Sequence, residues 1–129
     1  MAVRQYARIV GLTIVLIGVV GLVFGDKSLL DLLNIDIAED IIHLATGGLM
    51  AYVGFAMREN GPARLVVGGL GVVYLMVAIV GFIDSNPLGL FPSEYTALDN
   101  LIHLALGVLG IVIAWLAPGA AAHEHSRPA

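Results

Sequence analysis

The amino-acid sequence contains the same unit twice, at an offset of 60 residues. Residues 39–47 read Glu-Asp-Ile-Ile-His-Leu-Ala-Thr-Gly, and residues 99–107 read Asp-Asn-Leu-Ile-His-Leu-Ala-Leu-Gly. The offset continues without a gap through most of the chain, and the matched pairs include Arg4 with Arg64, Gly11 with Gly71, Gly21 with Gly81 and Leu49 with Leu109. We therefore expect two structural repeats, over about residues 4–57 and 64–117.

Long apolar runs fill most of both copies. Hydrophobic residues make up 59% of the chain and charged residues 12%, with a mean hydropathy of +0.95, whereas about a quarter of the residues of a soluble protein are charged. Runs of about 18 or more apolar residues are long enough to cross a bilayer core of about 30 Å. The sequence therefore predicts an all-α integral membrane four-helix bundle, with residues 1–129 as one domain. The predicted spans are 4–24, 37–57, 63–83 and 97–116, and a polar tail follows over 118–129.

The second and fourth spans both begin with a helix-capping pattern. Asp36 stands three residues before Glu39, and Thr96 stands three residues before Asp99. An N-cap side chain accepts a hydrogen bond near the third helical residue, whose own acid completes a capping box. We expect helices to start after Asp36 and Thr96, and residues 58–62 to form a tight Gly-Pro turn.

Positive charge gathers at one side of the predicted bundle. The two loops on the other side contain Lys27 as their only basic residue and are rich in acids. Loops rich in arginine and lysine stay in the cytoplasm, so we expect both termini to be cytoplasmic. With two spans in each copy, the repeats enter the membrane in the same direction and are related by a pseudo-two-fold axis along its normal. The arginines on the cytoplasmic side are Arg4, Arg8, Arg58, Arg64 and Arg127.

His43 and His103 are the central residues of the two copies. Each lies about seven residues inside its helix, or about 10 Å along an axis that rises about 1.5 Å per residue. In an up-down-up-down bundle the second and fourth helices are diagonal neighbours, so we expect the two imidazoles to face each other across the axis. Polar side chains at this depth normally face the protein interior and have a partner.

The doubled pattern resembles a known family. Asp-Asn-Leu-Ile-His-Leu-x-x-Gly at 99–107, preceded by Gly-Leu-Phe-Pro at 89–92, is similar to a motif of small prokaryotic membrane proteins with four spans. That family is described only as a domain of unknown function. The resemblance extends from the first span to Trp115 and implies the fold and the prokaryotic cytoplasmic membrane, but no activity. The first copy departs from the motif, because Asp40 stands where the second copy has an amide.

Several roles fit the two histidines. In the simplest, each imidazole bonds a carboxylate or a loop carbonyl, and the acids cap helices at the positive end of the helix dipole. Paired histidines of a four-helix bundle also suit one haem b, with space for the ring beside Gly47 and Gly107, four residues further along. Both histidines with Glu39 and Asp99 would suit a divalent metal such as zinc or manganese. Ion or proton transport is the last alternative, although no span carries a charge near the bilayer midplane.

Other classes of function are excluded by what the sequence lacks. The absence of cysteine rules out disulfides, thiolate metal sites, thiol catalysis and covalent c-type haem. The chain has no basic cluster of the kind that binds nucleic acid. We therefore expect a non-enzymatic structural or accessory protein that contacts the lipid bilayer and other membrane subunits or copies of itself. Binding of haem b or a divalent cation through the paired histidines is the alternative.

Overall fold

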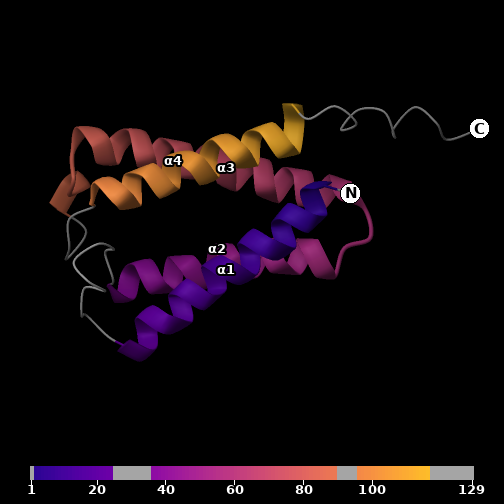
Figure 1. Ribbon diagram of the computed structural model, residues 1–129, viewed down its shortest axis with the longest axis horizontal. Coiled ribbons are helices and arrows are strands. Elements are labelled where there is room, and N and C mark those ends of the chain that lie inside the picture. Colours follow the sequence, from indigo (N-terminus) through magenta and orange to yellow (C-terminus); the bar gives the residue numbers. More distant parts are fainter. Residues whose placement is uncertain (1, 25–35, 90–95, 117–129) are drawn as a thin grey trace, which may run out of the picture.

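The structure is a computed structural model that describes residues 2–24, 36–89 and 96–116 (Figure 1). A short 3-10 helix, η1 (Pro87–Gly89), follows the third long helix, and a π-helical turn, η2 (Val112–Leu116), follows the fourth. The prediction of an all-α chain with four helices is confirmed over these ranges. The polar tail over 118–129 and the loop that holds Lys27 lie outside the described residues. The long helices are α1 (Ala2–Phe24), α2 (Ile37–Phe55), α3 (Asn60–Ile83) and α4 (Ala97–Ile111).

Three helices are long and apolar enough to cross a membrane. They are α1 with a mean hydropathy of 2.5, α3 with 2.5, and α4 with its π turn, Ala97–Leu116, with 2.0. The α2 helix has 19 residues, and the polar side chains of Glu39, Asp40 and His43 in its first two turns lower its hydropathy. The chain is thus a membrane protein, and the role of α2 as a fourth span stays a prediction.

The turn between α2 and α3 is shorter than the sequence predicts. The α2 helix ends at Phe55, and α3 begins at Asn60, so Gly61 and Pro62 lie inside its first turn. Proline is tolerated there because the first N–H groups of a helix have no acceptor within it. The prediction of a turn over 58–62 is therefore wrong for residues 60–62, which belong to α3.

The last helix also differs from its prediction as a regular helix to residue 116. From Val112 to Leu116 its turns widen into a π-helix. This segment carries Trp115, whose indole ring lies so close to Gly68 of α3 that a side chain on that glycine would overlap it. Turns of this kind are rare, so hydrophobic periodicity alone does not predict them.

The helices form two hairpins, α1 with α2 and α3 with α4, which lie side by side in Figure 1. Within each hairpin the backbones touch at glycines. A side-chain carbon on Gly11 would lie 2.6 Å from the backbone nitrogen of Ala51, and one on Gly107 would lie 2.6 Å from that of Leu75. Small residues allow such close approach, which gives membrane helices their packing energy.

The two hairpins meet through larger side chains. The α3 helix contacts both α1 and α2, and η2 contacts α1. The hydroxyl of Tyr6 on α1 donates a hydrogen bond to the carbonyl of Leu106 on α4, at 3.5 Å. The buried residues at this interface form one cluster of Val3, Ala7, Ile14, Met50, Val53, Ala63, Val67, Tyr74 and Ala114.

Apolar side chains also cover the outside of the bundle. Leu16 is 62% exposed, Leu65 72% and Ile83 81%. In water such surfaces would drive aggregation, but in a bilayer they contact acyl chains, as the membrane-spanning hydropathy requires.

Arginines close the first hairpin at the end where α1 begins. The guanidinium of Arg4 donates to the carbonyl of Arg58 at 3.0 Å, and that of Arg8 donates to the carbonyl of Gly54 at 2.7 Å. The Arg8 guanidinium also lies 5.2 Å from the centre of the Phe55 ring, within the range of a cation–π interaction. These contacts place three arginines together at one end of the bundle.

Neighbouring glycines on α2 allow a matched test of this packing. A side-chain carbon on Gly47 would lie 2.7 Å from the backbone nitrogen of Val15, whereas one on Gly48 would have no atom within 4 Å. We expect Gly47→Ala to lower the free energy of unfolding by about 1–3 kcal/mol because the hairpin must open. Gly48→Ala should leave it unchanged or slightly higher. Unfolding in detergent micelles followed by circular dichroism measures both, and equal effects would contradict the packing.

Candidate functional site

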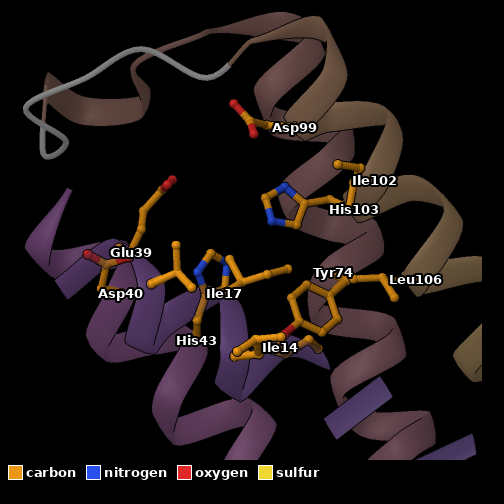
Figure 2. A pocket seen from close by; sticks show the side chains of 13 residues that line it. Ile14, Ile17, Glu39, Asp40, His43, Tyr74, Asp99, Ile102, His103 and Leu106 are labelled. Atoms are coloured by element: carbon orange, nitrogen blue, oxygen red, sulfur yellow. The ribbon is translucent and has the colours of Figure 1, made fainter. Parts of the chain in front are cut away.

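A cavity of about 260 Å³ lies between the two hairpins, towards the end where α2 and α4 begin (Figure 2). All four long helices contribute to its lining, and six of the 13 lining residues have aliphatic side chains. The lining residues are Ile14, Leu16, Ile17, Val20, Gly21, Glu39, Asp40, His43, Tyr74, Asp99, Ile102, His103 and Leu106.

The two repeated histidines come together at this cavity. His43 belongs to α2 and His103 to α4, and Figure 2 shows both imidazole rings pointing into the cavity from opposite hairpins. The Nδ1 atom of His43 is buried and has no hydrogen-bond partner among the described residues. The sequence alone predicted that these two side chains face one another. The structure places both on a single cavity.

Tyr74 of α3 holds the second imidazole in place. Its ring stacks on that of His103, with centroids 5.7 Å apart and planes inclined by 12°. The Tyr74 hydroxyl lies 2.9 Å from Oγ1 of Thr46, which itself donates to the carbonyl of Ile42 at 2.8 Å. Because Thr46 uses its proton on that carbonyl, Tyr74 is the donor in the bond between them. Tyr74 is thus hydrogen-bonded to Thr46 of the α1–α2 hairpin, while its ring packs against His103 of its own α3–α4 hairpin.

Carboxylates occupy the level above the imidazoles. The Thr96 backbone N–H and hydroxyl donate to Oδ2 of Asp99 at 3.0 and 2.8 Å, and the Asp99 N–H donates to Oγ1 of Thr96 at 3.1 Å. This is the capping box that the sequence predicts for α4. At the start of α2, Oδ1 of Asp36 accepts from the Glu39 N–H at 2.9 Å, which confirms the second predicted cap.

Helical spacing arranges the polar residues in layers. Glu39 and Asp99 lie one turn before the histidines, and Thr46 lies about one turn after His43. At a rise of about 1.5 Å per residue, each step is about 5–6 Å. The cavity therefore passes from carboxylates through imidazoles to the Tyr74 hydroxyl and then to aliphatic side chains.

Asp40 and Asn100 occupy matching places beside glycines. Both are only 3% exposed. A side chain on Gly21 would overlap the carboxylate of Asp40, and one on Gly81 would overlap the amide of Asn100. Each polar group therefore packs against a bare backbone on the neighbouring helix of its own hairpin.

The other residues predicted for a cofactor or metal site divide between the cavity and the contacts within the hairpins. Gly47 and Gly107 do not line the cavity, and the space beside them is filled by backbone atoms of Val15 and Leu75. Glu39 and Asp99 do line it. Within 2–24, 36–89 and 96–116, no three His, Asp or Glu side chains are grouped closely enough to hold one metal ion.

Comparison with known proteins gives a family match over less than half of the chain. The sequence profile of the family described as Domain of unknown function (DUF4383) matches residues 1–56. The resemblance to a family without an assigned activity is thereby confirmed over the first copy. No curated protein and no solved structure matches the chain.

Sequence reasoning missed two polar residues of the site, Tyr74 and Thr46. Tyr74 stands in the apolar run of the third predicted span, and it is only 5% exposed. A signal was present, because at the offset of 60 Tyr74 pairs with Ile14 and Thr46 pairs with Leu106. The Thr46–Tyr74 contact joins the two halves, and its repeat-related counterpart, Leu106 with Ile14, has no polar side-chain group to form a hydrogen bond.

A double-mutant cycle tests the bond between the hairpins. We expect Tyr74→Phe and Thr46→Val each to destabilise the protein, with a coupling energy of about 0.6–1.7 kcal/mol, the range found for hydrogen bonds between membrane helices. Tyr74→Phe keeps the ring that stacks on His103. Tyr52→Phe, on an exposed tyrosine of α2, is the matched control and should have no effect. A coupling energy of zero in unfolding measurements would show that the two hydroxyls do not interact.

Proposed function

We propose that this protein is a non-enzymatic membrane protein that binds a small molecule in the cavity between its hairpins. The observation that carries the proposal is the lining itself, in which two imidazoles from different hairpins meet aliphatic walls. Ligand sites are concave and mostly apolar, with a few polar groups that fix orientation. The volume of about 260 Å³ is just below the usual range of about 300–1,000 Å³, which favours a compact ligand.

The same residues fit an organic ligand better than haem or a metal ion. A haem near this end would need basic residues for its propionates, and the part of the lining that the structure describes contains carboxylates but neither lysine nor arginine. A divalent ion would need three or four converging ligands, and Asp99 already accepts two hydrogen bonds in its cap. Haem b or zinc and manganese ions held by His43 and His103 are therefore the alternatives that an experiment must exclude.

The binding test uses 2-phenylethanol, a neutral probe with one ring and one hydroxyl. We expect saturable binding to the purified protein in lipid nanodiscs, measured by isothermal titration calorimetry. Ile17 lines the cavity, and the Ile17→Trp substitution should abolish binding. Ile9→Trp, on the exposed face of the same helix, should not. Replacing both histidines by alanine should weaken binding by about tenfold or more, since each imidazole supplies about 0.5–1.5 kcal/mol as a hydrogen-bonding group.

Two results would contradict this function. Equal binding to the wild type and to Ile17→Trp would place the probe outside the cavity. The second result would be near-stoichiometric iron, zinc or manganese in protein purified without chelator, with the metal lost in the double histidine variant. That result would favour the haem or metal alternative over small-molecule binding.

A structural or accessory role is the second candidate, favoured by the outer surface. Gly48 and Gly69 face open space, with no atom within 4 Å of a side-chain carbon placed on either. Glycines that serve no contact inside the bundle leave room for a helix of another subunit or copy to approach. Absence of probe binding and of metal would leave this role.

For the arrangement in the membrane, we propose four spans in two parallel repeats. The repeat is supported by the matching burial of residues that stand 60 positions apart in the sequence. Every buried residue of α1 has a buried counterpart in α3, and five of the six in α2 have one in α4 or η2. The α1 and α3 pairs are Val3 with Ala63, Ala7 with Val67, Gly11 with Gly71, Ile14 with Tyr74, Gly18 with Ala78 and Gly21 with Gly81.

With four spans, the clustered arginines favour an arrangement with both termini in the cytoplasm. The chain has no cysteine, so single substitutions report topology directly. We expect a membrane-impermeant maleimide to label Ser85→Cys in intact prokaryotic cells and Glu59→Cys only after permeabilisation. The opposite pattern would reverse the orientation, and labelling of both sites in intact cells would contradict α3 as a span.

A further inference from the structure

We propose that the ligand is a small lipophilic organic cation, such as a protonated amine on an apolar body, which reaches the cavity from the bilayer. This proposal rests on the proposed binding function and adds the charge of the ligand and its route. Three features of the cavity carry it: its exposed walls, the residue types in its lining and the position of the basic residues.

The walls of the cavity continue into the lipid-facing surface. Leu16, Ile17 and Ile102 line the cavity, yet they are 62%, 44% and 39% exposed. They belong to α1 and α4, one helix from each hairpin. In a membrane these side chains contact acyl chains, so the site is open to molecules dissolved in the lipid. A ligand that takes this route must have an apolar body.

Charge in the lining selects the head group. Glu39, Asp40 and Asp99 all line the cavity, with exposures of 7%, 3% and 8%. The described lining contains neither lysine nor arginine. Charges removed from water interact more strongly than exposed ones, so this lining attracts a cation and repels a carboxylate or phosphate head group.

The basic residues of the helices lie at the other end of the bundle. Arg4 and Arg8 are bonded to the carbonyls of Arg58 and Gly54, near the turn between α2 and α3. The cavity lies near the starts of α2 and α4 (Figure 2). Within the described residues, the charged side chains that line the cavity are therefore all acidic, with the aromatic surface of Tyr74 and His103 beneath them. Aromatic rings also attract cations.

A matched set of probes separates charge from shape. The set contains 2-phenylethylamine, 2-phenylethanol and 3-phenylpropionate, which at pH 7 are cationic, neutral and anionic and share a phenyl ring on a short chain. We expect the amine to bind the protein in nanodiscs at least about tenfold more tightly than the alcohol, because a charge-assisted contact is stronger than a neutral one. The acid should bind more weakly than both.

Variants test the source of the preference. Glu39→Gln removes one charge and keeps the shape, and we expect it to weaken amine binding by about tenfold while the alcohol binds as before. Asp40→Asn introduces the residue that the second copy carries at position 100, and it should reduce the preference without loss of folding. Glu59→Gln, at the N-cap of α3 in the turn at the other end of the bundle, is the matched control and should leave all three affinities unchanged.

The outcomes distinguish selection of a cationic ligand from the binding of small molecules in general. If the amine and the alcohol bind with equal affinity, or if Glu39→Gln and Asp40→Asn leave their ratio unchanged, the ligand is not selected as a cation although the cavity binds small molecules. If none of the three probes binds, the binding function itself fails. Tighter binding of the acid would overturn the charge argument directly.

Discussion

Backbone contact between paired helices is the interaction on which the rest of this structure depends. In a bilayer there is little hydrophobic gain from bringing two apolar helices together, so close packing must supply the energy. Gly11 and Gly47 in one hairpin, and Gly71 and Gly107 in the other, bring the backbones into direct contact. Each hairpin is consequently a compact unit, and a single added methyl group at these positions would crowd the backbone of the facing helix.

The cavity follows from the contrast between contacts within and between hairpins. Within a hairpin, glycines leave no space. Between hairpins, the contact is made by larger residues such as Met50, Val67 and Tyr74, and these fill the bundle only over part of its length. Towards the starts of α2 and α4 the interface widens into a space lined by histidines and acids. Polar side chains there are tolerated because helix caps and the Tyr74 hydroxyl satisfy part of their hydrogen bonding.

The two halves of the site are similar without being equal. His43 and His103 have the same place in the two copies, but among the described residues only His103 stacks on a tyrosine. The counterpart of Tyr74 is Ile14, and Asp40 stands opposite Asn100. A ligand in the cavity would therefore meet two imidazoles in different surroundings, which gives it a single preferred orientation in a nearly symmetric frame.

Helix number, helix starts and membrane character could be predicted from the sequence, because apolar length and capping residues are local properties. The pairing of His43 with His103 in one region followed from the repeat. Sequence spacing left open what would fill the space beside Gly47 and Gly107, and in the structure a neighbouring backbone fills it.

What the sequence by itself determined, then, was which segments are helical and which residues recur at the offset of 60. The tertiary structure decided that Tyr74 and Thr46 join the hairpins, that α4 ends in a π turn, and that the histidines share a cavity. These depend on the distance and rotation between helices. Both are set by side-chain packing across the whole bundle, and no local pattern in the chain contains them.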